Sequence, residues 1–222
     1  MTIKNLNEVI ELDHGGGGYK SWELLKEIRR VLNFRGEWQN CEDDAAVLNI
    51  VPLLKGGRGV RNGGNIKNSP RPLYQGGDLK LVFTTDAFIV DPIFFPGGDI
   101  GKIAMAGTIN DLSVMGAKPL GISLSIIIEE GFPKSDLMKI ISSIDKVSRE
   151  AGVPVVTGDT KVTEKGKLDK IEITTSGVGL AEKIISNNGA KPGDLIITSG
   201  DLGEHAIALL SKRFNYKTKI KS

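Results

Sequence analysis

Acidic residues recur next to apolar segments of this chain in a pattern that suits metal and phosphate chemistry. Asp86 follows the segment LVFTT, Asp159 follows VPVVTG, and Asp43 and Asp44 open a further apolar stretch. At the ends of neighbouring strands, such side chains can converge on one rim of a sheet. Mg²⁺ is commonly held by one or two carboxylates together with substrate phosphates. The set as a whole therefore predicts a metal and phosphate site, although each aspartate alone is more typical of a helix cap or a turn.

Asp111 lies beside Asn110 inside the apolar sequence IAMAGTINDLSVMGA, within a predicted helix at 99–116. Because this helix is apolar on nearly every side, we expect it to be largely buried. A lone buried carboxylate is strongly unfavourable unless it is paired. Asp111 is therefore expected to need a cation.

Four consecutive glycines, Gly15 to Gly18, follow His14 and precede the first predicted helix. The backbone N–H groups of a glycine run can wrap a phosphate. No Gly-Lys-Ser/Thr follows, so the run is not a P-loop and indicates little by itself. Together with the acids and Lys102, it favours a triphosphate held by metal ions under a flexible glycine lid. Lys102 alone would equally suit a solvated lysine in the first turn of a helix.

The elements that must position these residues alternate along the chain. Helical periodicity is found at 21–32, 99–116 and 135–150. Strand-like segments are expected at 45–51, 79–85, 119–128, 153–156 and 170–180. Turn residues at 187–194 mark a domain boundary, beyond which 195–199 is expected to start a new strand and then a helix. There is no internal repeat.

Composition narrows the class of protein. The 222 residues carry 29 basic and 27 acidic side chains, and a net charge of +2 gives no support for nucleic acid as the main partner. The single cysteine, Cys41, permits no internal disulfide, and the N-terminus lacks the apolar core of a signal peptide. No apolar run approaches the ~18 residues of a membrane span. We therefore expect a cytoplasmic protein that does not contact a membrane.

Glycine is nearly twice as frequent as usual, with 28 residues in the chain against an ordinary share of about 7%. A second glycine cluster lies in the segment 54–77, mixed with asparagine, proline and basic residues without periodicity. This composition is typical of a mobile surface insert.

The sequence resembles the HypE family of hydrogenase maturation factors, within the AIR synthetase (PurM-like) ATP-binding superfamily. The resemblance runs from His14 to about Leu210 and rests on the strings HGGGG, EDDAA, FTTDAFIVDPIFFPGGDIGK, GTINDLSVMGAKP, IIIEEGFP and VPVVTGDTKV. It implies an α+β fold with a PurM-like N-terminal domain at 1–182, made of a mainly antiparallel sheet with helices. The β-barrel of that domain would be completed by dimerisation. Residues 190–222 would be the start of a PurM-like C-terminal domain.

The same resemblance implies a site that binds ATP and Mg²⁺. Four carboxylates would hold the metal: Asp44, Asp86, Asp111 and Asp159. Seven residues would bind the nucleotide: Gly15, Gly16, Gly17, Gly18, Lys102, Asn110 and Thr160. In this family ATP phosphorylates a carbamoyl oxygen on a C-terminal cysteine, and loss of the phosphate leaves a thiocyanate whose cyanide goes to the iron of nickel–iron hydrogenase. The implied partners are a second copy of the chain, a HypF-like carbamoyltransferase and a HypC–HypD iron scaffold.

The chain departs from that family pattern at its end. HypE-like chains continue to a tail that carries the reactive cysteine, whereas this one ends at KTKIKS. No catalytic residue is therefore assigned, and the activity is expected to be incomplete. Cys41 lies beside acids that disfavour a thiolate, so we expect it to pack rather than react. His205, in GEHA where the family has a His-Gly pair, is predicted to be at most a neighbour of the site.

Two other functions stay open. A sibling enzyme, selenophosphate synthetase or thiamine-monophosphate kinase, would share the acids. Selenophosphate synthetases carry a cysteine or selenocysteine beside a lysine where this chain reads LDHGGGGYK, which speaks against that enzyme. The second open function is a nucleotide-binding interaction module that dimerises and docks partners without turnover. Incubation with ATP and Mg²⁺ would distinguish such a module from the enzymes.

Overall fold

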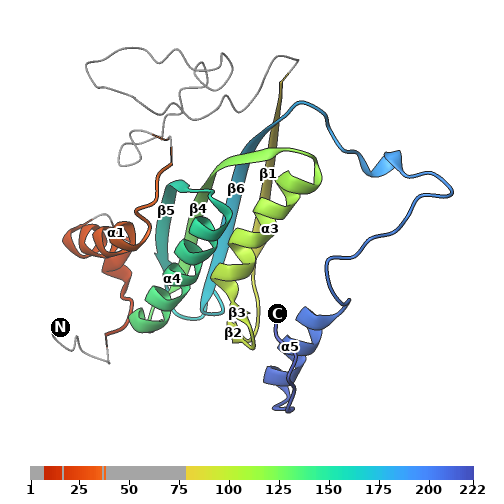
Figure 1. The fold of residues 1–222 in the computed structure, drawn as a ribbon. Coiled ribbons are helices and arrows are strands. Elements are labelled where there is room, and N and C mark those ends of the chain that lie inside the picture. Colours follow the sequence, from red (N-terminus) through yellow and green to blue (C-terminus); the bar gives the residue numbers. More distant parts are fainter. Residues whose placement is uncertain (1–7, 17, 37, 39–78) are drawn as a thin grey trace, which may run out of the picture.

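A four-stranded sheet covered on one face by helices forms the body of the protein (Figure 1). The structure is a computed structural model that describes residues 8–16, 18–36, 38 and 79–222. Several predicted features lie outside those residues: Gly17, Cys41, Asp44, the strand at 45–51 and the insert at 54–77. Within the described ranges, no helix combines the length and the apolar character needed to cross a membrane.

The sheet has the strand order β1-β6-β4-β5. Its strands are β1 (Lys80–Phe88), β4 (Lys118–Glu129), β5 (Val155–Thr163) and β6 (Ile171–Ala181). β6 lies antiparallel to β1 and β4, and β4 pairs in parallel with β5. Side chains alternate between the two faces of a strand. On β6, Ile171, Ile173 and Thr175 are buried, while the residues between them point to the open face.

Helices α3 (Ile100–Val114) and α4 (Lys134–Ala151) lie on the covered face, and α1 (Tyr19–Val31) packs beside α4. α4 buries its apolar stripe through Leu137, Ile140, Ile141 and Ile144, as the periodicity predicts. It ends at Gly152, whose φ of +68° is a conformation that glycine adopts without strain. All three helices begin and end within two residues of their predicted limits.

β5 is longer than the sequence predicts. The apolar segment 153–156 predicts a short strand, but β5 continues through polar residues to Thr163. Parallel pairing with β4 sustains this extension, with Asp159 opposite Ser125. Tertiary pairing thus overrides the weak strand propensity of glycine and aspartate.

A small hairpin, β2 (Phe94–Phe95) and β3 (Gly98–Asp99), directly precedes α3. Two short 3₁₀ helices, η1 (Leu12–His14) and η2 (Asn187–Gly189), precede α1 and follow β6. The last helix is α5 (Glu204–Arg213), which confirms the predicted helix near the end of the chain.

The predicted strand at 195–199 is wrong. Leu195, Ile196 and Ile197 are 88–95% exposed, and no other part of the described chain pairs with them. A strand needs a neighbour to satisfy its backbone N–H and C=O groups. The apolar pattern alone does not supply one.

Candidate functional site

Asp86 and Asp111 come together between β1 and α3. Asp86 lies on the covered face of β1, where Thr108 of α3 donates a hydrogen bond to its Oδ2 at 3.3 Å. Thr84, two residues earlier on the same face, donates to Oδ2 of Asp111 at 3.2 Å. Two carboxylates, from a strand and from the helix packed on it, thus share one location.

The electrostatics of this pair suit a bound cation. Burial, and next the negative charge of Asp111, raise the pKa of Asp86, while the hydrogen bond from Thr108 lowers it. A raised pKa means that the protein disfavours the ionised form of Asp86. A divalent cation would remove this penalty, because carboxylate oxygens are the ligands that Mg²⁺ takes.

Two threonines that the sequence analysis did not single out support the acid pair. The hydroxyl groups of Thr108 and Thr175 are hydrogen-bonded at 2.6 Å, and the Thr175 hydroxyl lies 3.2 Å from the carbonyl oxygen of Ala104. Both threonines are buried, and Thr175 lies opposite Asp86 on the neighbouring strand. They fix α3 against β6 and so set the position of Asp111. The threonine of GTIND, three residues before Asp111, is the signal that could have revealed this role.

The prediction that Asp111 is buried is wrong. Asn110 and Asp111 are both exposed, because α3 packs on the sheet and on α4 through one side only. That side consists of Ile100, Gly101, Ala104, Met105, Thr108 and Leu112. The need of Asp111 for a cation therefore rests on its proximity to Asp86 rather than on its own burial.

The predicted placement of the acids at strand ends is also wrong. Asp86 is the seventh of nine residues in β1, and Asp159 is the fifth of nine in β5. The direction of each side chain is therefore set by alternation along the strand. Asp86 points to the covered face. Asp159 is exposed and points to the open face, beside Ser125 of β4.

The glycine run lies against β5. A Cβ atom on Gly15 would lie 2.4 Å from the backbone nitrogen of Val162, so only glycine fits there. Gly18 is the N-cap residue of α1 and has no side chain to cap it, which leaves the N–H groups of the first turn available. Gly16 is held more loosely, through a 3.4 Å hydrogen bond from its N–H to the carbonyl of Asp13. The glycine run is thus held against β5 at Gly15 and ends at the N-terminus of α1, which favours anions.

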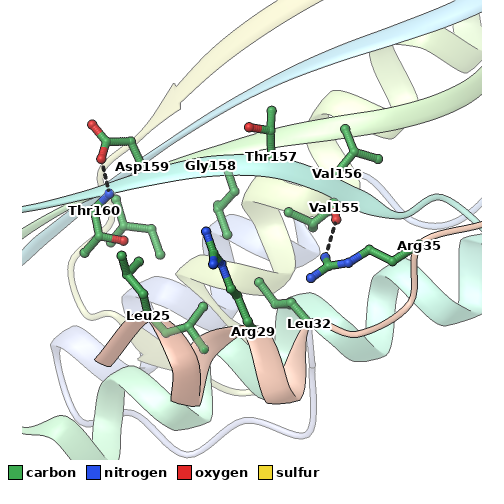
Figure 2. Close-up of a pocket in the computed structure, with 13 residues that line it drawn as sticks. Leu25, Arg29, Leu32, Arg35, Val155, Val156, Thr157, Gly158, Asp159 and Thr160 are labelled. Atoms are coloured by element: carbon green, nitrogen blue, oxygen red, sulfur yellow. Dashed lines mark hydrogen bonds between the residues drawn. The ribbon is translucent and has the colours of Figure 1, made fainter. Parts of the chain in front are cut away.

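A cleft of about 110 Å³ separates α1 from β5. In Figure 2, Thr160 and Arg29 lie on the α1 side of β5, whereas Asp159 and Thr157 lie on its other side. Oδ1 of Asp159 accepts a hydrogen bond from the N–H of Thr160 at 2.8 Å. Asp159 and Thr160 are neighbours in sequence but serve opposite faces of the strand.

One copy of the chain does not unite all the predicted residues. β1 and β5 are the two edges of the sheet, three strand spacings or about 14 Å apart. Lys102 lies in the first turn of α3, nine residues before Asp111, which corresponds to about 13 Å of helix. No cluster of three metal-binding side chains occurs among the residues that the structure describes. The acid pair therefore stands apart from both Lys102 and the group at β5.

Comparisons with known proteins agree with this fold. The model of the family "AIR synthase related protein, N-terminal domain" matches residues 42–181. The chain belongs to this family. As an AIR synthase related protein, it is 43% identical over 217 residues to the carbamoyl dehydratase HypE of Cupriavidus necator and 36% identical over 207 residues to that of Escherichia coli. These matches cover 96% and 92% of the chain but 54% and 55% of the relatives, so the chain spans about half their length.

Solved structures confirm the predicted α+β fold of this AIR synthase related protein. A hydrogenase maturation protein HypE in complex with ATP superposes with a TM-score of 0.78 at 36% identity, covering 96% of this chain and 56% of that one. One chain of a HypE–HypF complex gives a TM-score of 0.62 at 50% identity, covering 64% and 48%. A thiamine-monophosphate kinase from Stenotrophomonas maltophilia gives a TM-score of 0.57 at 20% identity, covering 88% and 54%. That last likeness shows the shared fold alone.

Proposed function

We propose that the chain is the ATP-binding part of a HypE-type carbamoyl dehydratase. The proposed reaction is the ATP-dependent dehydration of a carbamoylated C-terminal cysteine to a thiocyanate, which supplies the cyanide ligands of nickel–iron hydrogenase. The observation that carries this proposal is the Asp86–Asp111 pair, in a chain 43% identical to a carbamoyl dehydratase HypE. Because the chain spans about half of that relative, the reaction as a whole remains part of the proposal.

ATP with Mg²⁺ is the proposed cofactor, and it supplies the phosphoryl group that activates a carbamoyl oxygen. Asp86 and Asp111 would hold the metal, because their shared negative charge is already unfavourable without one. Asn110, which directly precedes Asp111 on the exposed side of α3, would contact the nucleotide. The likeness of the chain to a solved HypE that contains ATP supports the nucleotide part of this proposal.

The group at β5 would bind the phosphates. The N–H groups of Gly18 and of the first turn of α1 can donate to phosphate oxygens. The N–H groups of Gly15 and Gly16 already donate to the carbonyl oxygens of Leu12 and Asp13, so these two glycines would contribute by letting the backbone approach the phosphates closely. Thr160 adds a hydroxyl group on the same side of β5, and Asp159 adds a carboxylate on the open face. Asp44 and Gly17 complete the proposed set but lie outside the described residues.

A homodimer would bring the two halves of this site together. Within a single copy, the acids at one edge of the sheet and the phosphate-binding groups at the other lie about 14 Å apart, which is farther than one triphosphate with its metal ion reaches. On the open face of β1, Leu81 and Phe83 are 67% and 64% exposed. Adjacent large apolar side chains on one face of a strand are usually covered by a partner. A second copy packed on this face would cover them and complete the barrel that the family resemblance implies.

The proposed partners are a HypF-like carbamoyltransferase, which would deliver the carbamoyl group, and a HypC–HypD scaffold, which would receive the cyanide. The similarity to one chain of a solved HypE–HypF complex supports the first of these.

Isothermal titration with ATP in the presence of Mg²⁺ tests the metal site. We expect Asp86→Asn and Asp111→Asn each to weaken binding by about tenfold or more, because each removes a charged metal ligand. Asp169→Asn is the matched control, since Asp169 is 73% exposed on the loop before β6. Unchanged affinity in both site variants would overturn the assignment. Release of ADP by the same samples would separate an enzyme from a binding module.

A further inference from the structure

The last part of the chain packs on the β2–β3 hairpin, beside which α5 lies in Figure 1. The ring of His205 meets Phe95 edge to face, with 5.4 Å between ring centroids. At the other end of α5, the guanidinium of Arg213 donates to the carbonyl oxygen of Asp91 and lies 3.9 Å from its carboxylate. Both ends of α5 are therefore tied to the segment that leads into α3.

Ser222 extends this contact through three of its groups. Its N–H donates to the carbonyl of Pro96 at 2.8 Å, and its hydroxyl is hydrogen-bonded to Nδ1 of His205 at 2.8 Å. Its carbonyl oxygen accepts from Nζ of Lys102 at 2.7 Å. The approach is close because Gly97 lacks a side chain: a Cβ there would lie 2.1 Å from the same carbonyl oxygen.

Lys102 is the charged centre of this contact. Its ammonium donates to the carbonyl oxygens of Gly97 and Ser222, both at 2.7 Å. These two acceptors come from the hairpin and from the far end of the described chain, so the ammonium bridges them. A charged donor strengthens such hydrogen bonds. The same lysine is about 13 Å of helix away from Asp111.

We propose that the β2–β3 hairpin and Lys102 form the docking surface for residues 204–222, and that Lys102 is a positioning residue rather than a phosphate ligand. The backbone N–H of Lys102 also donates to the side chain of Asp99, the N-cap of α3, at 3.0 Å. One residue thus joins the docked segment to the start of the helix that carries Asp111. This role of Lys102 does not depend on the proposed function.

Hydrogen exchange of the full chain, with the ATP affinity measured in parallel, tests the proposal. Lys102→Met is expected to speed exchange in residues 204–213 by about tenfold, because loss of a charged hydrogen bond favours local undocking. The affinity for ATP with Mg²⁺ is expected to stay at the wild-type value. His205→Ala should also speed exchange in that segment, and Lys102→Arg should retain protection because it keeps a charged donor. Lys146→Met on α4, where the side chain is 76% exposed, is the matched control and should change neither quantity.

Two results would overturn the proposal. One is wild-type exchange in residues 204–213 of both Lys102→Met and His205→Ala. The other is a loss of ATP affinity in Lys102→Met while exchange in that segment stays unchanged, which would assign the ammonium to a phosphate instead.

Discussion

Gly101→Ala is expected to destabilise the protein by forcing α3 away from α4. Gly101 is buried in the first turn of α3. A Cβ there would lie 2.6 Å from the carbonyl oxygen of Ile140 and 3.0 Å from Cγ1 of Ile144, whereas ordinary contact begins at 3.4 Å. The nearest atom belongs to the backbone of α4 and cannot rotate away. The two helices must therefore separate locally by up to 0.8 Å, the difference between 3.4 and 2.6 Å.

Two opposing effects set the size of the change. Overpacking a core costs about 1–3 kcal/mol, and replacing glycine by alanine in a helix recovers up to about 1 kcal/mol. We expect a net loss of about 1 kcal/mol in the free energy of unfolding. Gly107→Ala is the matched control, because it makes the same substitution in the same helix. Its Cβ would meet only the ring tip of Phe88, at 2.9 Å. That ring is half-buried and can move, so this variant should match or exceed the wild-type stability.

Urea unfolding of the two variants and the wild type measures the difference. The two variants should differ by about 1–2 kcal/mol, which at an m-value of about 1–3 kcal/mol/M separates their midpoints by roughly 0.3–2 M, with Gly101→Ala the lower. A midpoint for Gly101→Ala at or above that of Gly107→Ala, with unchanged m-values, would refute the close α3–α4 packing. The same packing positions Asp111 on the far half of α3.

Three further predictions follow from charges and from the open face of the sheet. Burial, and next the charge of Asp111, raise the pKa of Asp86, so its ionised form destabilises the fold above that pKa. Without Mg²⁺, Asp86→Asn should therefore unfold at a higher temperature than the wild type at pH 7. This gain in unfolding temperature should vanish as the pH falls through the raised pKa toward the ordinary aspartate pKa. Burial lowers the pKa of Lys134, but hydrogen bonds to two glutamates outweigh burial and raise that pKa overall. Lys134→Met should therefore cost about 1 kcal/mol at neutral pH. In thermal unfolding, this deficit should shrink as the pH rises above the ordinary lysine pKa and vanish once it passes the raised one. Phe83→Asp should shift sedimentation toward monomer by placing like charges in the open face, and an unaltered dimer would remove that face from the proposed interface.

The helices and most strand positions could be predicted because their signals are local. The stripe of Leu137, Ile140, Ile141 and Ile144 depends only on helical periodicity, and it is buried as expected. The extent of β5 could not be predicted, because Gly158 and Asp159 are poor strand formers held in place by pairing with β4.

The site was predictable in its residue types but not in its arrangement. The acids were found from sequence, and Asp86 and Asp111 do meet. That Asp159 lies at the opposite edge of the sheet follows from the strand order β1-β6-β4-β5, which no local pattern encodes. The same holds for Lys102, because its acceptor on Ser222 is 120 residues away in sequence. Long-range partners of this kind decide which charges are available for a ligand.

Asp86 and Asp111 are proposed to hold the divalent cation that accompanies ATP. The most direct measurement is anomalous diffraction from crystals of the full chain grown with Mn²⁺ and a non-hydrolysable ATP analogue. We expect a manganese peak within about 2.5 Å of a carboxylate oxygen of both aspartates. Bound nucleotide with its manganese elsewhere, and no peak at Asp86 or Asp111, would contradict it.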